Sequence, residues 1–191
     1  MRTVCLGDSF TQGYGVKRDE NWVHLLNAPC STFINKGISG DTTGGMLARF
    51  CHDAVNENPN YLFLAGGVND LIAGVSETVP QANYFAMVHQ AYHHSLIPVI
   101  CTTPPFDPEA ARAGWSEFTD FDLVKSRYKA LRSWLLKLAA AYGLFYVDFY
   151  GEFEKTLSQN PDKDFYIDGI HLTPEGHEII ASIVLDALRG F

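Results

Sequence analysis

A serine near one end of the chain and a histidine near the other have the residue types of a nucleophile and its base. Ser9 lies in the tetrapeptide Gly-Asp-Ser-Phe, and His171 closes the tetrapeptide Asp-Gly-Ile-His. A serine hydroxyl is a weak nucleophile at neutral pH, and an imidazole can take its proton. A carboxylate must hold that imidazole in one tautomer, and Asp168 lies close before it in the chain. We therefore expect Ser9, His171 and Asp168 to form a catalytic triad for acyl transfer.

Acyl transfer also needs hydrogen-bond donors for the negative oxygen of the tetrahedral intermediate. The candidates for this oxyanion hole are the backbone N–H of Ser9, the backbone N–H of Gly40 and the side-chain amide of Asn69. Glycine lets a substrate approach the backbone closely, and an amide donates without adding a charge. Each residue also has a simpler structural interpretation: Ser9 as a helix N-cap, Gly40 as a loop residue and Asn69 as a turn residue.

The elements that must position these residues alternate along the chain. Short β-rich apolar segments are separated by longer segments of helical period, which predicts βαβ units around a parallel sheet. The expected strands are residues 3–6, 31–35, 61–65, 98–102 and 144–148. In an open parallel sheet, ligands bind beyond the carboxyl ends of the strands. The segments that carry Ser9, Gly40, Asn69 and His171 all follow expected strands, so we expect them to meet at one edge.

Helices are expected over residues 41–56, 81–95 and 121–141, and after Thr173, which reads as an N-cap before Pro174. Residues 103–120 have no predicted element, and an irregular segment of this length is uncommon without a function. Its aromatic residues are candidates for a lid or a wall of the substrate site; they are Phe106, Trp115 and Phe118. The alternative is that these aromatic side chains pack the loop onto the domain surface.

Composition limits the partners of this chain. With 191 residues, 47% of them apolar, we expect one folded domain spanning residues 1–191. The net charge of -8 gives no electrostatic reason to bind nucleic acid or an anionic membrane. We expect no integral membrane association and, since the N-terminus lacks the apolar core of a signal peptide, a cytoplasmic location.

No metal site is expected either. The four cysteines lack metal-binding spacing and are expected to be reduced, with Cys5 as a core thiol. His89 and His93 have a spacing that can bind metal on a helix, but a solvated helix face is the preferred interpretation. His177 is expected to be structural.

Four motifs in this order resemble those of the GDSL/SGNH hydrolase family. They are Gly-Asp-Ser-Phe at residues 7–10, Gly-Asp-Thr at residues 40–42, Gly-Val-Asn-Asp at residues 67–70 and Asp-Gly-Ile-His at residues 168–171. The resemblance implies a flavodoxin-like three-layer α/β/α sandwich with a five-stranded parallel sheet. It also implies the triad and oxyanion hole named above, acting without a metal or organic cofactor. Phe10 departs from the leucine usual in the family, and we expect this to alter packing rather than chemistry.

The sequence therefore predicts a serine-dependent hydrolase of carboxylic esters with a small-molecule substrate, of the lipase or acylhydrolase type. Within the same family, carbohydrate acetylesterase, acyl-thioesterase and lysophospholipase activities remain open. A non-catalytic binding domain on the same fold is the alternative from another class. A nucleotide-binding module is disfavoured because no Gly-rich phosphate loop follows the first expected strand. The oligomeric state is left open.

Overall fold

In a computed structural model of the chain, which describes residues 1–114 and 119–190, five parallel strands form one sheet. They are β1 (Arg2–Gly7), β2 (Thr32–Gly37), β3 (Tyr61–Ala65), β4 (Ile97–Cys101) and β5 (Phe145–Val147). Their order is β2-β1-β3-β4-β5, the flavodoxin-like order, in which the sequence of strands reverses at β1 and β3. The expected fold class is confirmed, and each expected strand overlaps an observed one.

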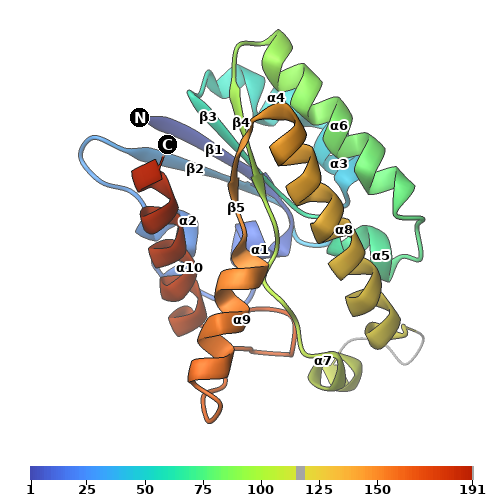
Figure 1. The fold of residues 1–191 in the computed structure, drawn as a ribbon. Helices are drawn as coiled ribbons and strands as arrows, with labels where there is room; N and C mark the ends of the chain where they lie inside the picture. Colours follow the sequence, from blue (N-terminus) through green and yellow to red (C-terminus); the bar gives the residue numbers. More distant parts are fainter. Residues whose placement is uncertain (115–118, 191) are drawn as a thin grey trace.

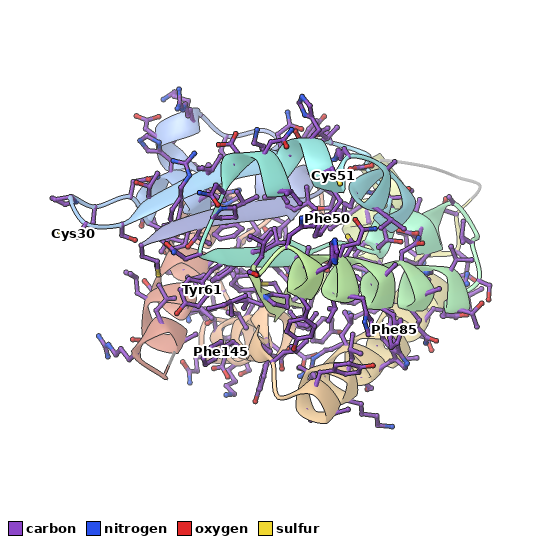
Figure 2. The ribbon with its side chains drawn as sticks, turned by 90° about the horizontal axis from the view of Figure 1, so that it is seen from above. Cys30, Phe50, Cys51, Tyr61, Phe85 and Phe145 are labelled. Atoms are coloured by element: carbon purple, nitrogen blue, oxygen red, sulfur yellow. The ribbon has the colours of Figure 1, made fainter. Side chains whose placement is uncertain are left out.

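The central strands are apolar because helices cover both faces of the sheet. Val4, Cys5 and Leu6 of β1 are fully buried, although adjacent side chains point to opposite faces. At the amino ends of the strands, Tyr61 and Phe145 lie with ring centroids 6.4 Å apart (Figure 2). This aromatic pair lies at the end of the sheet opposite to the one from which the motif loops emerge.

Two helical layers complete the sandwich (Figure 1). One layer contains α3 (Thr43–Ala48), α4 (Phe50–Asp53), α5 (Val68–Ile72), α6 (Thr78–His93) and α8 (Phe121–Tyr142). The other contains α2 (Trp22–Leu25), α9 (Phe149–Gln159) and α10 (Pro174–Ala187). Shorter elements are α1 (Ser9–Gln12), α7 (Pro108–Gly114) and the 3₁₀ turns η1 (Arg18–Glu20), η2 (Val55–Glu57) and η3 (Leu188–Gly190). Each layer buries its own apolar cluster against one face of the sheet.

Two of the helix predictions are close to the structure. Thr173 is the N-cap of α10, accepting from the backbone N–H of Gly176, and Pro174 is its first residue. Helix α8 differs from the expected range only by Tyr142. Helix α6 begins at Thr78 and ends at His93, so it overlaps the expected residues 81–95 with an earlier start.

The single helix expected over residues 41–56 is wrong. The segment is divided into α3, α4 and η2, with the first break at Arg49. The backbone of Arg49 leaves the helical region, and its guanidinium donates to the Asp41 carboxylate and to the carbonyl of Gly7. These bonds to residues distant in sequence favour a break in the helix, which the spacing of apolar residues does not reveal.

The segment 103–120 is not irregular throughout, because α7 occupies Pro108–Gly114. Asp107 accepts from the backbone N–H of Glu109, and Pro108 begins the helix. Phe106 is 3% exposed and its ring lies 6.3 Å from that of Phe121. Trp115 and Phe118, the other aromatic candidates, lie outside the described residues.

The cysteines and surface histidines lie where the sequence places them. Cys5 and Cys101 are buried, whereas Cys30 and Cys51 are exposed on separate elements (Figure 2). Burial raises the pKa of the Cys5 thiol far above its ordinary value, which keeps it protonated and inert. His89 and His93 are exposed on α6, which agrees with a solvated helix face.

Candidate active site

The structure brings Ser9, His171 and Asp168 into one hydrogen-bonded chain. The Nε2 atom of His171 lies 2.9 Å from the Oγ of Ser9, across 162 positions of sequence. Its Nδ1 atom lies 2.7 Å from Oδ2 of Asp168. The side chain of His171 is 6% exposed and that of Asp168 is 18% exposed, so this chain of polar groups is largely shielded from water.

Ser9 is positioned by the turn between β1 and α1. Asp8, rather than Ser9, is the N-cap of α1: its carboxylate accepts from the backbone N–H of Phe10 at 3.0 Å. The N-cap interpretation of Ser9 is therefore wrong, and its hydroxyl is directed to His171 instead. A side chain at Gly7 would place its Cβ 2.2 Å from Oγ1 of Thr11, so the strand can turn this tightly only with glycine.

Asp168 organises the loop that carries His171. Its Oδ1 atom accepts from the backbone N–H of Ile170 at 3.0 Å and of His171 at 2.8 Å, while Oδ2 contacts the imidazole. Gly169 has φ +83°, and a Cβ there would lie 2.4 Å from the backbone nitrogen of Ala111. One carboxylate thus fixes both the turn and the histidine ring. This agrees with the expectation that Asp168 is close enough in sequence to contact His171 within one turn.

Gly40 and Asn69 lie beside the same cavity as Ser9 and His171. Gly40 has φ +79°, and no atom lies within 4 Å of where its Cβ would be, so the backbone here is open to a ligand. The Nδ2 atom of Asn69 donates to the carbonyl of Asp41 at 2.9 Å. A primary amide carries two N–H groups, and this bond orients the group with one of them.

Buried polar contacts join the first three motif loops. Arg49 donates to the carboxylate of Asp41 and to the carbonyl of Gly7, each at 2.8 Å. Asp70 accepts from both the backbone N–H and the hydroxyl of Thr43. Burial raises the pKa of Asp8 to about 7, and the charges of Asp41 and Asp70 act in the same direction. The acidic residues of the motifs therefore stabilise the loops.

The cavity beside Ser9 has a volume of about 150 Å³. Its apolar walls are formed by Val68 and Ile170, which lie inside the third and fourth motifs, and by Ile72, Pro104 and Phe106. Phe106 was expected as a substrate-binding residue, and it does line the cavity. Val68 and Ile170 lie inside motifs in which only the polar residues and glycine suggested a role, and nothing local in the sequence distinguishes Ile72 and Pro104 from other apolar residues.

Tyr14 is a further site residue that the sequence did not reveal. Its ring lies over the imidazole of His171, with centroids 4.3 Å apart and planes inclined by 39°. It follows the first motif in a Gly-Tyr-Gly segment, and these flanking glycines are the one local signal that could have indicated it. His177, by contrast, is buried in the helical layer, where burial and the nearby His171 lower its pKa to about 4.

The described part of the chain contains neither a cluster of metal-binding side chains nor a membrane-spanning helix. Residues 1–114 and 119–190 contain no group of three or more histidine, cysteine or acidic side chains that could hold a metal ion. Nor does any helix in this part of the chain have the length and apolar character needed to cross a membrane.

Known proteins resemble this chain in sequence. It is 32% identical to an arylesterase of Vibrio mimicus over 93 residues, covering 46% of each chain. It is 30% identical to the esterase TesA of Pseudomonas aeruginosa over 94 residues, covering 46% of this chain and 47% of that one. The matched segment therefore spans about half the length of each relative.

Solved structures share the fold over nearly the whole length of this chain. A lipolytic G-D-S-L family protein of Veillonella parvula superposes with a TM-score of 0.82 at 21% identity, covering 96% of both chains. The family model described as the GDSL-like lipase/acylhydrolase family matches residues 5–179, a segment that contains all four motifs. This chain belongs to the GDSL-like lipase/acylhydrolase family.

Proposed function

We propose that this protein hydrolyses carboxylic esters through an acyl-enzyme on Ser9, with His171 and Asp168 completing a catalytic triad. The observation that carries the proposal is the alignment of Ser9 Oγ, His171 and Asp168 beside a cavity that Ser9 and His171 both line. Membership of the family and the sequence similarity to an arylesterase and an esterase support ester hydrolysis.

In the first half-reaction, Asp168 accepts the Nδ1–H of His171, and this tautomer lets Nε2 accept the proton of Ser9. The serine oxygen attacks the ester carbonyl and forms a tetrahedral intermediate. The negative oxygen is stabilised by the backbone N–H groups of Ser9 and Gly40 and by the amide of Asn69. Collapse breaks the bond to the alcohol, which leaves with the proton that His171 returns to it.

In the second half-reaction, His171 takes a proton from water and the resulting hydroxide attacks the acyl group on Ser9. The same donors stabilise the second tetrahedral intermediate. Its collapse releases the carboxylic acid, and His171 returns the proton to the oxygen of Ser9. No group beyond the side chains and backbone already named is needed to balance these steps.

The size and lining of the cavity favour a short acyl chain. A cavity of about 150 Å³ with aliphatic and aromatic walls is of the size that holds roughly six carbon atoms. The apolar side chains of Val68, Ile72 and Phe106 provide no partner for a charged or highly hydroxylated group. We therefore propose an acyl group of about two to six carbon atoms and an alcohol part that extends toward solvent.

Replacing the proposed nucleophile tests the mechanism. Ser9→Ala is expected to lower kcat for p-nitrophenyl butyrate by about 10⁴-fold or more, because it removes the covalent step. The circular dichroism spectrum and the melting temperature should stay close to those of the parent. The control is Ser182→Ala, an exposed serine whose hydroxyl only donates to a carbonyl of its own helix. Equal hydrolysis by parent and Ser9→Ala would rule the mechanism out.

A series of substrates tests the acyl group separately. With p-nitrophenyl esters from acetate to palmitate, kcat/KM is expected to peak at or below hexanoate and to fall by tenfold or more at decanoate. The reason is that longer chains exceed the cavity and leave methylene groups in water. Rates that rise steadily to palmitate would contradict the short-chain proposal while leaving the triad intact. Acyl-CoA and acetylated sugars in the same assay distinguish the other family activities.

A further inference from the structure

The ring of Tyr14 covers one face of the proposed catalytic base. The ring centroids of Tyr14 and His171 are 4.3 Å apart and their planes are inclined by 39°. Tyr14 is 43% exposed, whereas the side chain of His171 is only 6% exposed. The tyrosine therefore lies between the imidazole and solvent, on the side of the histidine that neither Ser9 nor Asp168 occupies.

The backbone around Tyr14 is shaped to hold this position. Helix α1 ends after a single turn because Gly13 adopts φ +84°, and the backbone N–H groups of Gly13 and Tyr14 both donate to the carbonyl of Ser9. Gly15 adopts φ +82°, and a Cβ there would lie 2.7 Å from Cδ1 of Ile167. Two left-handed glycines thus turn the chain so that Tyr14 projects over the histidine loop. Through its bond to the carbonyl of Ser9, the backbone of Tyr14 is joined directly to the residue that carries the proposed nucleophile.

We propose that Tyr14 is a positioning residue for His171, an inference that rests on the proposed function. The ring holds the imidazole in the plane that joins Asp168 Oδ2 to Ser9 Oγ and limits its rotation toward solvent. When His171 takes the serine proton it becomes a cation, and the negative face of an aromatic ring attracts a cation. The interaction is therefore stronger in the transition state than in the resting protein, which is the condition for raising kcat.

The aromatic ring, not the hydroxyl, performs this task. Tyr14→Phe is therefore expected to keep at least half of the parent's kcat for p-nitrophenyl butyrate. Tyr14→Leu is expected to lose about tenfold in kcat, with KM within twofold of the parent. A matched control is Tyr92→Leu. Tyr92 is about as exposed as Tyr14 but lies on α6, away from the proposed triad. This substitution should leave both constants unchanged.

A second measurement separates this inference from the proposed function. In the NMR spectrum of the parent, the ring current of Tyr14 should shift the Hε1 signal of His171 upfield, and Tyr14→Leu should remove the shift and broaden the signal. Inactive parent protein would defeat the proposed function but leave this contact measurable. Tyr14→Leu with the parent's kcat, or with a change confined to KM, would overturn the positioning role, and the second result would make Tyr14 a substrate contact.

Discussion

Two buried histidines only a few residues apart have very different surroundings. His171 lies in a tight loop, where its ring nitrogens meet the Asp168 carboxylate and the Ser9 hydroxyl. His177 lies in the first turns of α10, where its ring stacks on Phe10 at 6.5 Å. Its Nδ1 accepts weakly from the backbone N–H of Trp22 at 3.5 Å. The exposed fractions, 7% and 1%, hardly distinguish them.

The difference lies in the neighbours and not in the burial. A histidine buried among apolar groups loses hydration of its charged form, and here burial together with His171 lowers the pKa of His177 to about 4. The ring of His177 is therefore neutral at pH 7 and serves as a packing group. Beside His171 a carboxylate at 2.7 Å provides the charge that a protonated ring needs. A buried histidine becomes a candidate base only when such a partner accompanies it.

Removing the negative charge of Asp168 should leave the ring of His171, like that of His177, with no carboxylate beside it. Asp168→Asn keeps an oxygen that can accept from the backbone N–H groups of Ile170 and His171, so the loop should survive. The amide would instead donate to Nδ1, which forces the ring proton onto Nε2 and prevents it from accepting the proton of Ser9. We expect kcat for p-nitrophenyl butyrate to fall by about 10³-fold to 10⁴-fold.

The matched control for this change lies in the same loop. Asp164 accepts from the backbone N–H of Tyr166, two residues later, at 2.9 Å, just as Asp168 accepts from the backbone N–H of Ile170. Unlike Asp168, it does not hydrogen-bond to the ring of His171. Asp164→Asn should therefore leave kcat within twofold. If Asp168→Asn kept more than a tenth of the parent's kcat with an unchanged fold, the carboxylate would not be what distinguishes the two histidines.

Much of this arrangement could be predicted from sequence because its signals are local. The strands are short apolar segments, and the motif residues follow them. Asp168 and His171 are close enough in sequence to meet within a single turn, whatever the rest of the chain does. The expected edge of the sheet also follows from the rule that parallel strands bring their carboxyl ends together.

The remaining features depend on contacts between distant segments. The break at Arg49 comes from bonds to Asp41 and to a carbonyl of β1. The spacing of apolar residues along the segment does not reveal these bonds. The contact of Tyr14 with His171 joins the two ends of the chain. The low pKa of His177 depends on packing in the same way, since the sequence suggests a structural role for this residue but not how deeply its ring is buried.

The last prediction concerns His177, where the expected effect is on stability. Its folded pKa of about 4 is below the ordinary value of 6.5, so the unfolded chain binds the proton first as pH falls. The stabilisation is complete above pH 6.5 and is lost as the pH falls toward 4. Between pH 7.5 and pH 5 this costs the parent about 2 kcal/mol of unfolding free energy. His177→Gln, whose amide can still accept from Trp22, should lack this part of the acid destabilisation.

Urea denaturation at the two pH values measures that difference directly. Carboxylates lose their ionic partners on acidification in both proteins, so the test is the difference between parent and variant rather than either curve. His93→Gln, at an exposed position of α6, should follow the parent at both pH values. Equal acid sensitivity of parent and His177→Gln would mean that His177 takes up a proton in the folded protein as readily as in the unfolded chain. Burial would then have failed to keep the ring neutral, and the contrast with His171 would rest only on the contacts of His171 with Asp168 and Ser9.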